Sequence, residues 1–209
     1  MYLMTSTRCG ISAKQLEREL GVHYKTAWRM MNKIRTELMA DDGEPLFGDV
    51  EVDETAWGGR PRNKHQTRSE AGLFRERKAT VLGMVERGGR LRLRVVPSRR
   101  GEGFSREVRA NINPQSLLIT DDWVAYKPLR GNFRDHRTIN HSAGSYVVGD
   151  IHTNTIEGAF GNFKVGARGA YRKISGKWLQ SYLDEYTYRY NHRHSRRSMF
   201  ASLLEEAAK

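Results

Sequence analysis

Cysteine is nearly absent from the 209-residue sequence. The single Cys9 excludes a disulfide framework and a zinc site built from cysteines. The first ten residues lack the apolar core of a signal peptide, and no segment approaches the roughly 18 apolar residues of a membrane span. We therefore expect a cytoplasmic protein without a membrane segment.

Acidic residues are in deficit, with 24 Asp and Glu against 36 Lys and Arg, which gives a formal net charge of +12. A basic excess of this size favours a polyanionic partner, because each neutralised phosphate releases condensed counterions. A merely soluble basic protein and one that binds anionic membrane surfaces are the alternatives, which composition cannot separate. Hydrophobic residues, at 38%, suffice for one sizeable domain with a small appendage.

Residues 11–39 carry the pattern of two helices joined by a tight turn. Ser12 and Gln15 have the spacing of a capping box, and Gly21 suits the left-handed conformation that ends a helix. A second helix is predicted over 24–38. Two short helices around a glycine turn are typical of a helix-turn-helix segment, although a helical hairpin that only packs is the alternative. The residues expected to contact DNA are Tyr24, Lys25, Thr26 and Arg29, and those expected to pack are Leu16, Leu20, Ala27, Met31, Ile34 and Leu38.

After a linker at 41–45 the pattern changes to strands and helices. A half-buried strand is predicted over 47–55, where Val50 and Val52 alternate with acidic residues. Residues 58–78 are rich in Arg and Lys and are expected to form an exposed loop. Further strands are predicted at 79–86, 91–96, 116–120 and 138–141, and helices at 104–112, from 154, at 175–191 and at 200–207. The order predicts an α/β fold, a mixed sheet flanked by helices, with domains at 1–40 and 46–209.

Three acidic residues fall where an α/β sheet presents its site, at strand ends and a helix start. Asp53 ends the first strand, Asp121 follows the strand SLLIT, and Glu157 lies in the first turn of the helix beginning HTNTIEG. Carboxylates without His or Cys partners suit Mg²⁺ or Mn²⁺, and two such ions support phosphoryl transfer. Taken singly, each acid also fits a structural role: a strand residue, a turn residue with which Asp122 competes, and a helix cap with Asn154.

At these residues the sequence resembles bacterial insertion-sequence transposases of the DDE class, in the ISXO-like lineage. The resemblance covers nearly the whole chain, and its segments are ISAKQLERELGVHYKTAWRMMNKIR, VEVDETAWGGR, ITDDWVAY, NHSAGSYV and HTNTIEGAFGNFKVGARGAYRKISGKWLQSYLDEYTYRYNHR. It implies an RNase H-like catalytic domain that uses two divalent ions, Mg²⁺ or Mn²⁺, to cut transposon ends and join them to target DNA. Relatives commonly carry a zinc ribbon before the helix-turn-helix, and this sequence starts too late to include one.

The resemblance also implies roles for single residues. Asp53 corresponds to the first catalytic acid and Asp121 to the second, while Asp122 occupies a variable position. For the third role, members differ between an acid and an asparagine, so Glu157 and Asn154 compete. We favour Glu157 because a carboxylate is the better ligand for a hard dication.

Two further residues near the third acid match the family. Lys164 lies seven residues after Glu157, on the same helix face, where it is expected to bind a DNA phosphate; a solvated lysine is the alternative. His152 is expected to position DNA or a water, or only to satisfy a hydrogen bond. Glu185 and Arg189 resemble the family's Glu-Arg-Arg signature, with a helix ion pair as the alternative. The basic residues expected to contact DNA are Arg60, Arg62, Lys64, Lys164, Arg168 and Arg189.

The expected partner is double-stranded DNA, both transposon terminal repeats and target DNA, bound in the nucleoid by a homodimer or a higher oligomer. Two other functions remain open at this point. The chain is alternatively a DNA-binding protein derived from a transposase, without catalysis. It is alternatively an RNase H-type nuclease that acts on RNA–DNA hybrids.

Overall fold

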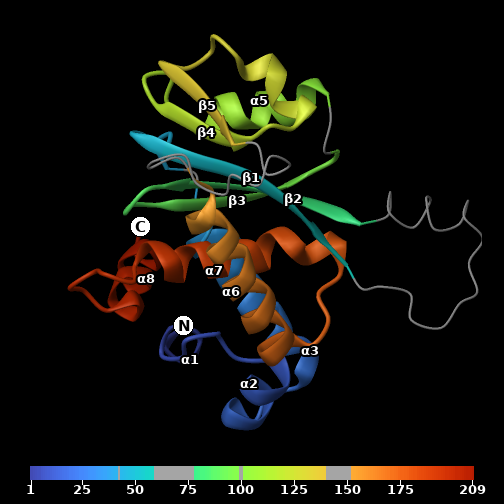
Figure 1. Ribbon diagram of the computed structural model, residues 1–209. Coiled ribbons are helices and arrows are strands. Elements are labelled where there is room, and N and C mark those ends of the chain that lie inside the picture. Colours follow the sequence, from blue (N-terminus) through green and yellow to red (C-terminus); the bar gives the residue numbers. More distant parts are fainter. Residues whose placement is uncertain (42, 59–77, 99–100, 140–151) are drawn as a thin grey trace, which may run out of the picture. The chain divides into compact units, whose positions relative to one another are not determined.

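The computed structural model describes residues 1–41, 43–58, 78–98, 101–139 and 152–209 (Figure 1). They form two compact units. The helical unit contains Met1–Gly43, Ala159–Ile174 and Trp178–Lys209, and the sheet unit contains Glu44–Gly158 and Ser175–Lys177. The junction after Gly43 lies inside the predicted linker, whereas the C-terminal helices group with the N-terminal segment. No helix in the described ranges is long and apolar enough to cross a membrane.

The sheet unit is built on a five-stranded mixed sheet with the order β3-β2-β1-β4-β5. Its strands are β1 (Asp49–Trp57), β2 (Ala79–Glu86), β3 (Leu91–Val96), β4 (Leu117–Asp121) and β5 (Asp135–Ile139). β1 pairs antiparallel with β2 and parallel with β4. The parallel strands need crossovers, which α5 (Glu102–Asn111) and the 3₁₀ helix η1 (Val124–Leu129) provide. This is the predicted RNase H-like α/β fold.

The hairpin has the predicted bounds, but other strand bounds differ. β1 begins at Asp49 instead of residue 47, because the residues before it make separate contacts. Leu46 forms an isolated bridge with Ile112, and the Phe47 amide donates to the Glu86 carboxylate at 2.9 Å. β5 covers Asp135–Ile139 instead of 138–141, and η1 was not predicted. The expected loop at 58–78 lies almost entirely outside the described residues.

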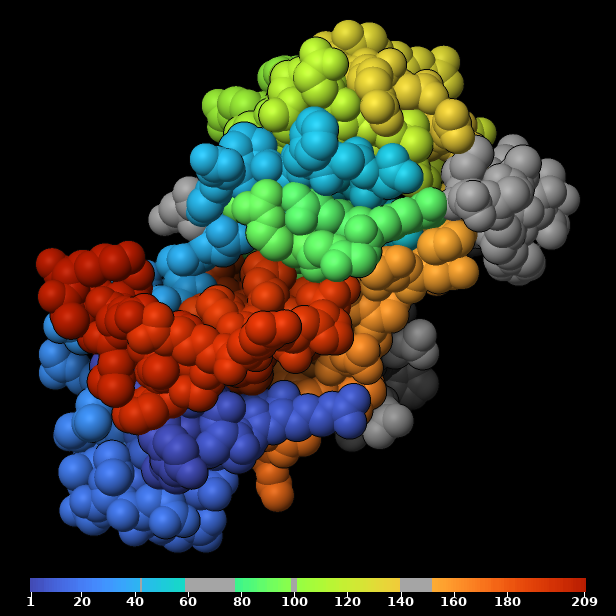
Figure 2. All heavy atoms as spheres, turned by 90° about the vertical axis from the view of Figure 1, so that its left-hand side faces the viewer, coloured from blue at the N-terminus to red at the C-terminus, as the bar shows by residue number. Residues whose placement is uncertain are grey.

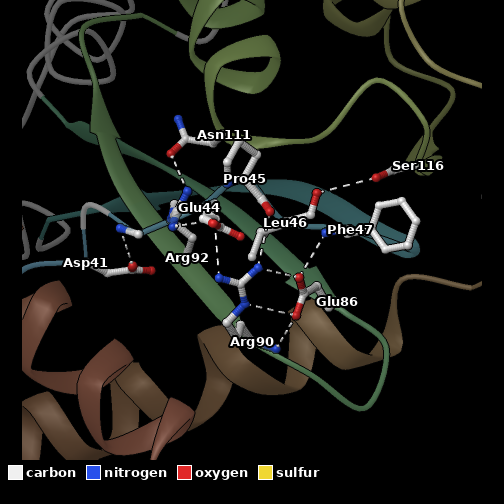
Figure 3. Close-up of polar contacts among 11 residues, drawn as sticks. Asp41, Glu44, Pro45, Leu46, Phe47, Glu86, Arg90, Arg92, Asn111 and Ser116 are labelled. Carbon is white, nitrogen blue, oxygen red and sulfur yellow. Dashed lines mark hydrogen bonds and ion pairs between the residues drawn. The ribbon is translucent and has the colours of Figure 1, made fainter.

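A polar clamp holds the segment that enters β1 (Figure 3). The Glu86 carboxylate accepts hydrogen bonds from the amides of Phe47 and Arg90, both at 2.9 Å. The Arg90 guanidinium donates to the carbonyl oxygens of Glu44 and Pro45, each at 3.2 Å. The backbone polar groups of an irregular segment are thereby satisfied against the β2–β3 hairpin.

One face of the sheet packs on α5 and η1 and forms the core of the sheet unit. Its fully buried residues include Val50, Val52, Leu82, Met84, Phe104, Val108, Leu118 and Tyr126. The valines of β1 alternate as predicted. Glu51, however, is 0% exposed, so the interpretation of β1 as a half-buried strand with a wet acidic face is wrong at this position.

The helical unit packs the N-terminal helices against the C-terminal ones, blue and red in Figure 2. Its helices are α1 (Tyr2–Thr5), α2 (Ala13–Leu20), α3 (Tyr24–Leu38), α6 (Asn154–Tyr171, from Ala159 onward), α7 (Leu179–Asn191) and α8 (Met199–Ala207). The short 3₁₀ helix η3 (Gly176–Trp178) occupies the predicted start of α7. The core of the helical unit contains Met4, Ile11, Leu16, Ala27, Met31, Met39 and Leu203.

The predicted helix pair is present as α2 and α3. The Ser12 hydroxyl accepts from the Gln15 amide at 3.1 Å, and Gly21 adopts φ +64° at the end of α2. α3 has the predicted bounds. Leu20, the last residue of α2, was expected to pack with Leu16 but is 47% exposed.

A buried ion-pair network joins three helices of the helical unit. Glu185 of α7 binds Arg35 of α3 at 2.6 Å and Arg189 at 2.5 Å, and accepts from the Tyr171 hydroxyl of α6 at 2.8 Å. Burial alone would raise the pKa of Glu185, but the Arg189 and Arg35 guanidinium groups outweigh it and hold the pKa below its ordinary value. The carboxylate is therefore ionised and compensates two largely buried cations.

We expect Glu185→Gln to lower the free energy of unfolding by about 3–5 kcal/mol, because it leaves two buried guanidinium groups without a carboxylate. Glu37→Gln is the control: it breaks the exposed Lys33–Glu37 pair of α3, which is worth about 0.3–0.5 kcal/mol. Urea titrations of both variants measure the difference. Equal, small losses would show that the network contributes little.

Candidate functional site

Asp53 and Asp121 lie side by side at one end of the sheet. β1 and β4 run parallel, and the last pair in their register is Glu51 with Ile119. Each aspartate stands two residues beyond that pair on its own strand. Because side chains alternate along a strand, Asp53 and Glu51 share one face of the sheet. Asp121 is the last residue of β4, but Asp53 does not end β1 as predicted: the strand continues to Trp57, because β1 pairs with β2 beyond the point where its pairing with β4 stops. The two carboxylates are nevertheless neighbours on adjacent strands.

The start of α6 is fixed on the same face by the buried Glu51 carboxylate. Its Oε2 accepts hydrogen bonds from the amides of Thr155 and Ile156, at 2.9 and 3.1 Å, and its Oε1 accepts from the Thr155 hydroxyl at 2.9 Å. The first amides of a helix have no partner within the helix and carry the positive end of its dipole. Glu51 satisfies both needs and joins α6 to β1.

The second oxygen of Glu51 also contacts basic side chains. Arg87 Nε donates to Oε1 at 3.0 Å, and a further Arg87 nitrogen donates to the His152 carbonyl at 3.0 Å. His152 Nδ1 lies 3.3 Å from the same Oε1, an electrostatic contact without hydrogen-bond geometry. Among the described residues His152 Nδ1 has no hydrogen-bond partner, so both roles considered for His152, positioning DNA or a water and satisfying a hydrogen bond, stay predictions.

Glu157 lies in the first turn of α6, as predicted, but its local partner differs from the expected one. The Thr153 hydroxyl donates to Glu157 Oε1 at 3.0 Å, and the Glu157 amide donates to the Thr153 carbonyl at 3.1 Å. Asn154 is the first helical residue and is exposed. The predicted cap between Asn154 and Glu157 is therefore wrong, because Thr153 occupies the position before the helix.

The three acids interact electrostatically. Burial is the largest cause that raises the pKa of Asp53, to about 7. The Glu54 amide, which donates to Asp53 Oδ1 at 2.8 Å, opposes this shift, whereas the charges of Glu54, Asp121 and Glu157 add to it. A carboxyl group with its pKa near neutrality beside two other acids is typical of a site that binds a cation.

The donor set fits hard divalent cations, since all three candidate ligands are carboxylates, and burial, with a smaller contribution from the neighbouring acids, raises the pKa of Asp53. The arrangement is nevertheless not a preformed cluster. Within the described ranges, no three His, Cys, Asp or Glu side chains are gathered closely enough to hold a metal ion. Binding of Mg²⁺ or Mn²⁺ therefore requires these side chains to turn toward one another.

Comparison with known proteins agrees with this fold. Residues 45–191 match the ISXO2-like transposase domain, a range that contains all three acids. The chain belongs to the ISXO2-like transposase family. It is also similar to an uncharacterized protein in transposable element ISH50 of Halobacterium salinarum, with 32% identity over 169 residues. That alignment covers 75% of this chain but only 57% of the relative's length.

In this transposase-family chain, the residues expected to read DNA begin α3. Their side chains are exposed, as contact with DNA requires: Tyr24, Lys25, Thr26 and Arg29. Farther along α6, Lys164 is half-buried and Arg168 is exposed. Arg60, Arg62 and Lys64 lie outside the described residues.

Arg189 has a different place from the one expected. Its side chain is 10% exposed, pairs with Glu185 and donates to the Met4 carbonyl at 3.4 Å. The ion-pair alternative accounts for Arg189, whose largely buried side chain is not available for the predicted contact with DNA.

Sequence reasoning missed Glu51, Arg87 and Thr155. The alternation along β1 put Glu51 on a solvated face with Asp49 and Asp53, and nothing local distinguishes it from them. Its partner Thr155 is 104 residues away. The available signal was Thr155 itself, two residues before Glu157, because the amides in the first turn of a helix need an acceptor from outside the helix.

We expect the affinity of the transposase-family chain for Mn²⁺ to fall about tenfold per pH unit below pH 7, because the ion must displace the proton of Asp53. Above pH 7 the dependence on Asp53 disappears. Calorimetric titrations between about pH 5.5 and 8.5 measure this slope. Asp53→Asn is the control, and its Mn²⁺ affinity should not show this pH dependence. A wild-type Mn²⁺ affinity that is unchanged between about pH 5.5 and 7 would contradict the assignment of Asp53 as a metal ligand with a raised pKa.

The same group predicts a pH dependence of folding. The pKa of Asp53 in the fold, about 7, lies above its ordinary value of 3.8, so the folded metal-free chain binds more protons between these limits. Its stability contribution is present below pH 4 and is lost as the pH rises through 7. Urea titrations should show that Asp53→Asn flattens this part of the profile. A parallel profile in the variant would count against the raised pKa.

Proposed function

We propose that the chain catalyses metal-dependent cleavage of DNA at transposon ends and transfer of the cut strand into target DNA. One observation carries the proposal: the register of β1 and β4 puts Asp53 beside Asp121, and the hydrogen bonds of Glu51 hold the start of α6, which carries Glu157, on the same face of the sheet. Separate segments that bring acids together at a strand end fit phosphoryl transfer better than a structural role. Membership of a transposase family supports DNA as the substrate.

Asp53, Asp121 and Glu157 would hold the ions. When bound, two Mg²⁺ or Mn²⁺ ions supply the positive charge that stabilises the attacking and leaving oxygens of a phosphodiester. The contribution of Asp53 depends on loss of its proton, which burial and the neighbouring acids delay until about pH 7. Lys164, two turns along α6 from Glu157, would bind a backbone phosphate.

Two transfers at one site account for cutting and joining. In the first, a water loses a proton as its oxygen bonds to phosphorus at the transposon end, the bond to the 3′ oxygen breaks, and the released 3′ oxygen takes up a proton. In the second, this 3′ hydroxyl loses its proton, bonds to a target phosphorus and displaces the target's own 3′ oxygen, which takes up a proton. Neither transfer needs a covalent link to the protein.

DNA would be held by the exposed start of α3, where Tyr24, Lys25, Thr26 and Arg29 lie together. The second helix of a helix-turn-helix enters the major groove with its N-terminal residues toward the bases. Since an element has two ends, we propose that a homodimer or a higher oligomer assembles on DNA.

A second candidate, a DNA-binding protein without catalysis, is favoured by a specific observation. The described residues include no preformed cluster of metal ligands. A wild-type chain that binds terminal-repeat DNA but neither binds Mn²⁺ nor cuts would support this candidate.

We expect Asp53→Asn and Asp121→Asn each to lower strand transfer by more than roughly 100-fold, because loss of a ligand exceeds the effect of losing an outer partner. The assay uses DNA with the element's own terminal repeats and Mg²⁺. Asp122→Asn is the matched control, an exposed neighbour that should retain activity. Full activity in either ligand variant would refute the assignment, and preferential cutting of RNA–DNA hybrids by the wild type would indicate an RNase H-type nuclease.

We expect Lys25→Ala to weaken binding to terminal-repeat DNA and to reduce the slope of log affinity against log salt concentration by about one, since one phosphate contact is lost. Fluorescence anisotropy at several salt concentrations measures both. Lys209→Ala removes an equal charge at the C-terminus, where Lys209 pairs with Glu206, and should leave the slope unchanged. Equal effects of the two variants would argue against DNA reading by α3.

A further inference from the structure

We propose that Glu51 is a positioning residue: by holding the first turn of α6 on β1, its carboxylate sets where Glu157 stands relative to Asp53. The inference rests on the proposed function, because it concerns the same metal site. It assigns a role to a fully buried acid that is not itself among the proposed ligands.

The contacts of Glu51 divide between its two oxygens. Oε2 accepts hydrogen bonds from the backbone amides of Thr155 and Ile156, at 2.9 and 3.1 Å. Oε1 faces the Thr155 hydroxyl at 2.9 Å, Arg87 Nε at 3.0 Å and His152 Nδ1 at 3.3 Å. Oε2 thus anchors the backbone of the helix. Oε1 joins the helix through the Thr155 hydroxyl and, with Arg87, fixes the orientation of the carboxylate.

The anchored atoms are close in sequence to both acids. Asp53 is two residues after Glu51 on β1, and Glu157 is one residue after Ile156 on α6. A strand and a helical turn are stiff over so few residues, so a shift at the Glu51 carboxylate moves Glu157 relative to Asp53. Productive sites tolerate only about 0.5 Å of such displacement.

A second acid of the same sheet, Glu86, accepts similar hydrogen bonds without holding the segment that carries Glu157. Glu86 also accepts from two backbone amides, those of Phe47 and Arg90, but it anchors the segment that enters β1 (Figure 3). Its partners carry none of the three proposed ligands. Glu86 therefore provides a matched control for the loss of a carboxylate anchor.

The test is Mn²⁺ affinity, measured by calorimetry on the full chain without DNA. Glu51→Gln keeps the shape of the side chain but removes its charge and one acceptor oxygen. We expect it to weaken Mn²⁺ binding by roughly 10–100-fold, the range for partners that orient metal ligands. Thr155→Val removes only the hydroxyl donor and should cause a smaller loss in the same direction, which keeps the proposal testable if Glu51→Gln does not fold.

A double-mutant cycle separates positioning from general destabilisation. If Glu51 acts through Glu157, adding Glu51→Gln to Glu157→Gln should change Mn²⁺ affinity by less than about threefold. Glu86→Gln should lower thermal stability while leaving Mn²⁺ affinity within about twofold of the wild type. Both results would support positioning.

Three outcomes would overturn the proposal. The first is wild-type Mn²⁺ affinity in Glu51→Gln, and the second is an equal loss in the presence and absence of Glu157. The third is an equal loss in Glu86→Gln. In all three the wild-type chain still binds Mn²⁺, so the proposed function stands. A wild-type chain that binds no Mn²⁺ sinks the proposed function and the inference together.

Discussion

The bond between a strand carboxylate and a helix start is the constraint on which the site depends. Glu51 links β1 to α6 across 104 residues of sequence. Parallel pairing of β1 with β4 puts Asp53 beside Asp121, but no sheet pairing controls Glu157, which lies on a helix. The amides at the start of α6 need an acceptor, and a buried acid on the neighbouring strand provides it. The need of the first amides of α6 for an acceptor thereby also brings a third acid, Glu157, to the sheet.

Both units use buried carboxylates, but with different partners. In the helical unit, Glu185 compensates the guanidinium groups of Arg35 and Arg189, so charge is balanced by charge. In the sheet unit, Glu51 combines one arginine with backbone amides and a hydroxyl. Removing one member of such a set leaves the others unpaired in a low-dielectric interior, which costs more than the pair contributes. Both clusters therefore fix the relative positions of helices and strands that hydrophobic packing alone would leave less specific.

Elements whose signals are local were predictable from sequence. The turn at Gly21 and the bounds of α3 follow from capping residues and periodicity, and the β2–β3 hairpin follows from a glycine turn between apolar runs. Asp121 stood out because the end of its strand can be read locally, whereas the predicted end of β1 at Asp53 was too early, since the pairing of β1 with β2 continues to Trp57. Glu51 and Arg189 could not be placed, since their partners are distant in sequence and the same polar letters fit a solvated face. The burial of Leu20 was also predicted wrongly, because periodicity gives the face of a helix but not how completely its neighbours cover that face.

No cluster of metal ligands is gathered within the described residues, and this observation concerns the orientation of the side chains more than the position of the backbone. The register of β1 with β4 and the hydrogen bonds of Glu51 fix the backbones that carry Asp53, Asp121 and Glu157, whereas the Glu157 side chain accepts from the Thr153 hydroxyl. A side chain can change rotamer without disturbing these contacts, but moving a strand or a helix start breaks its hydrogen bonds. The backbone positions are therefore the part of the proposed metal site that the fold fixes.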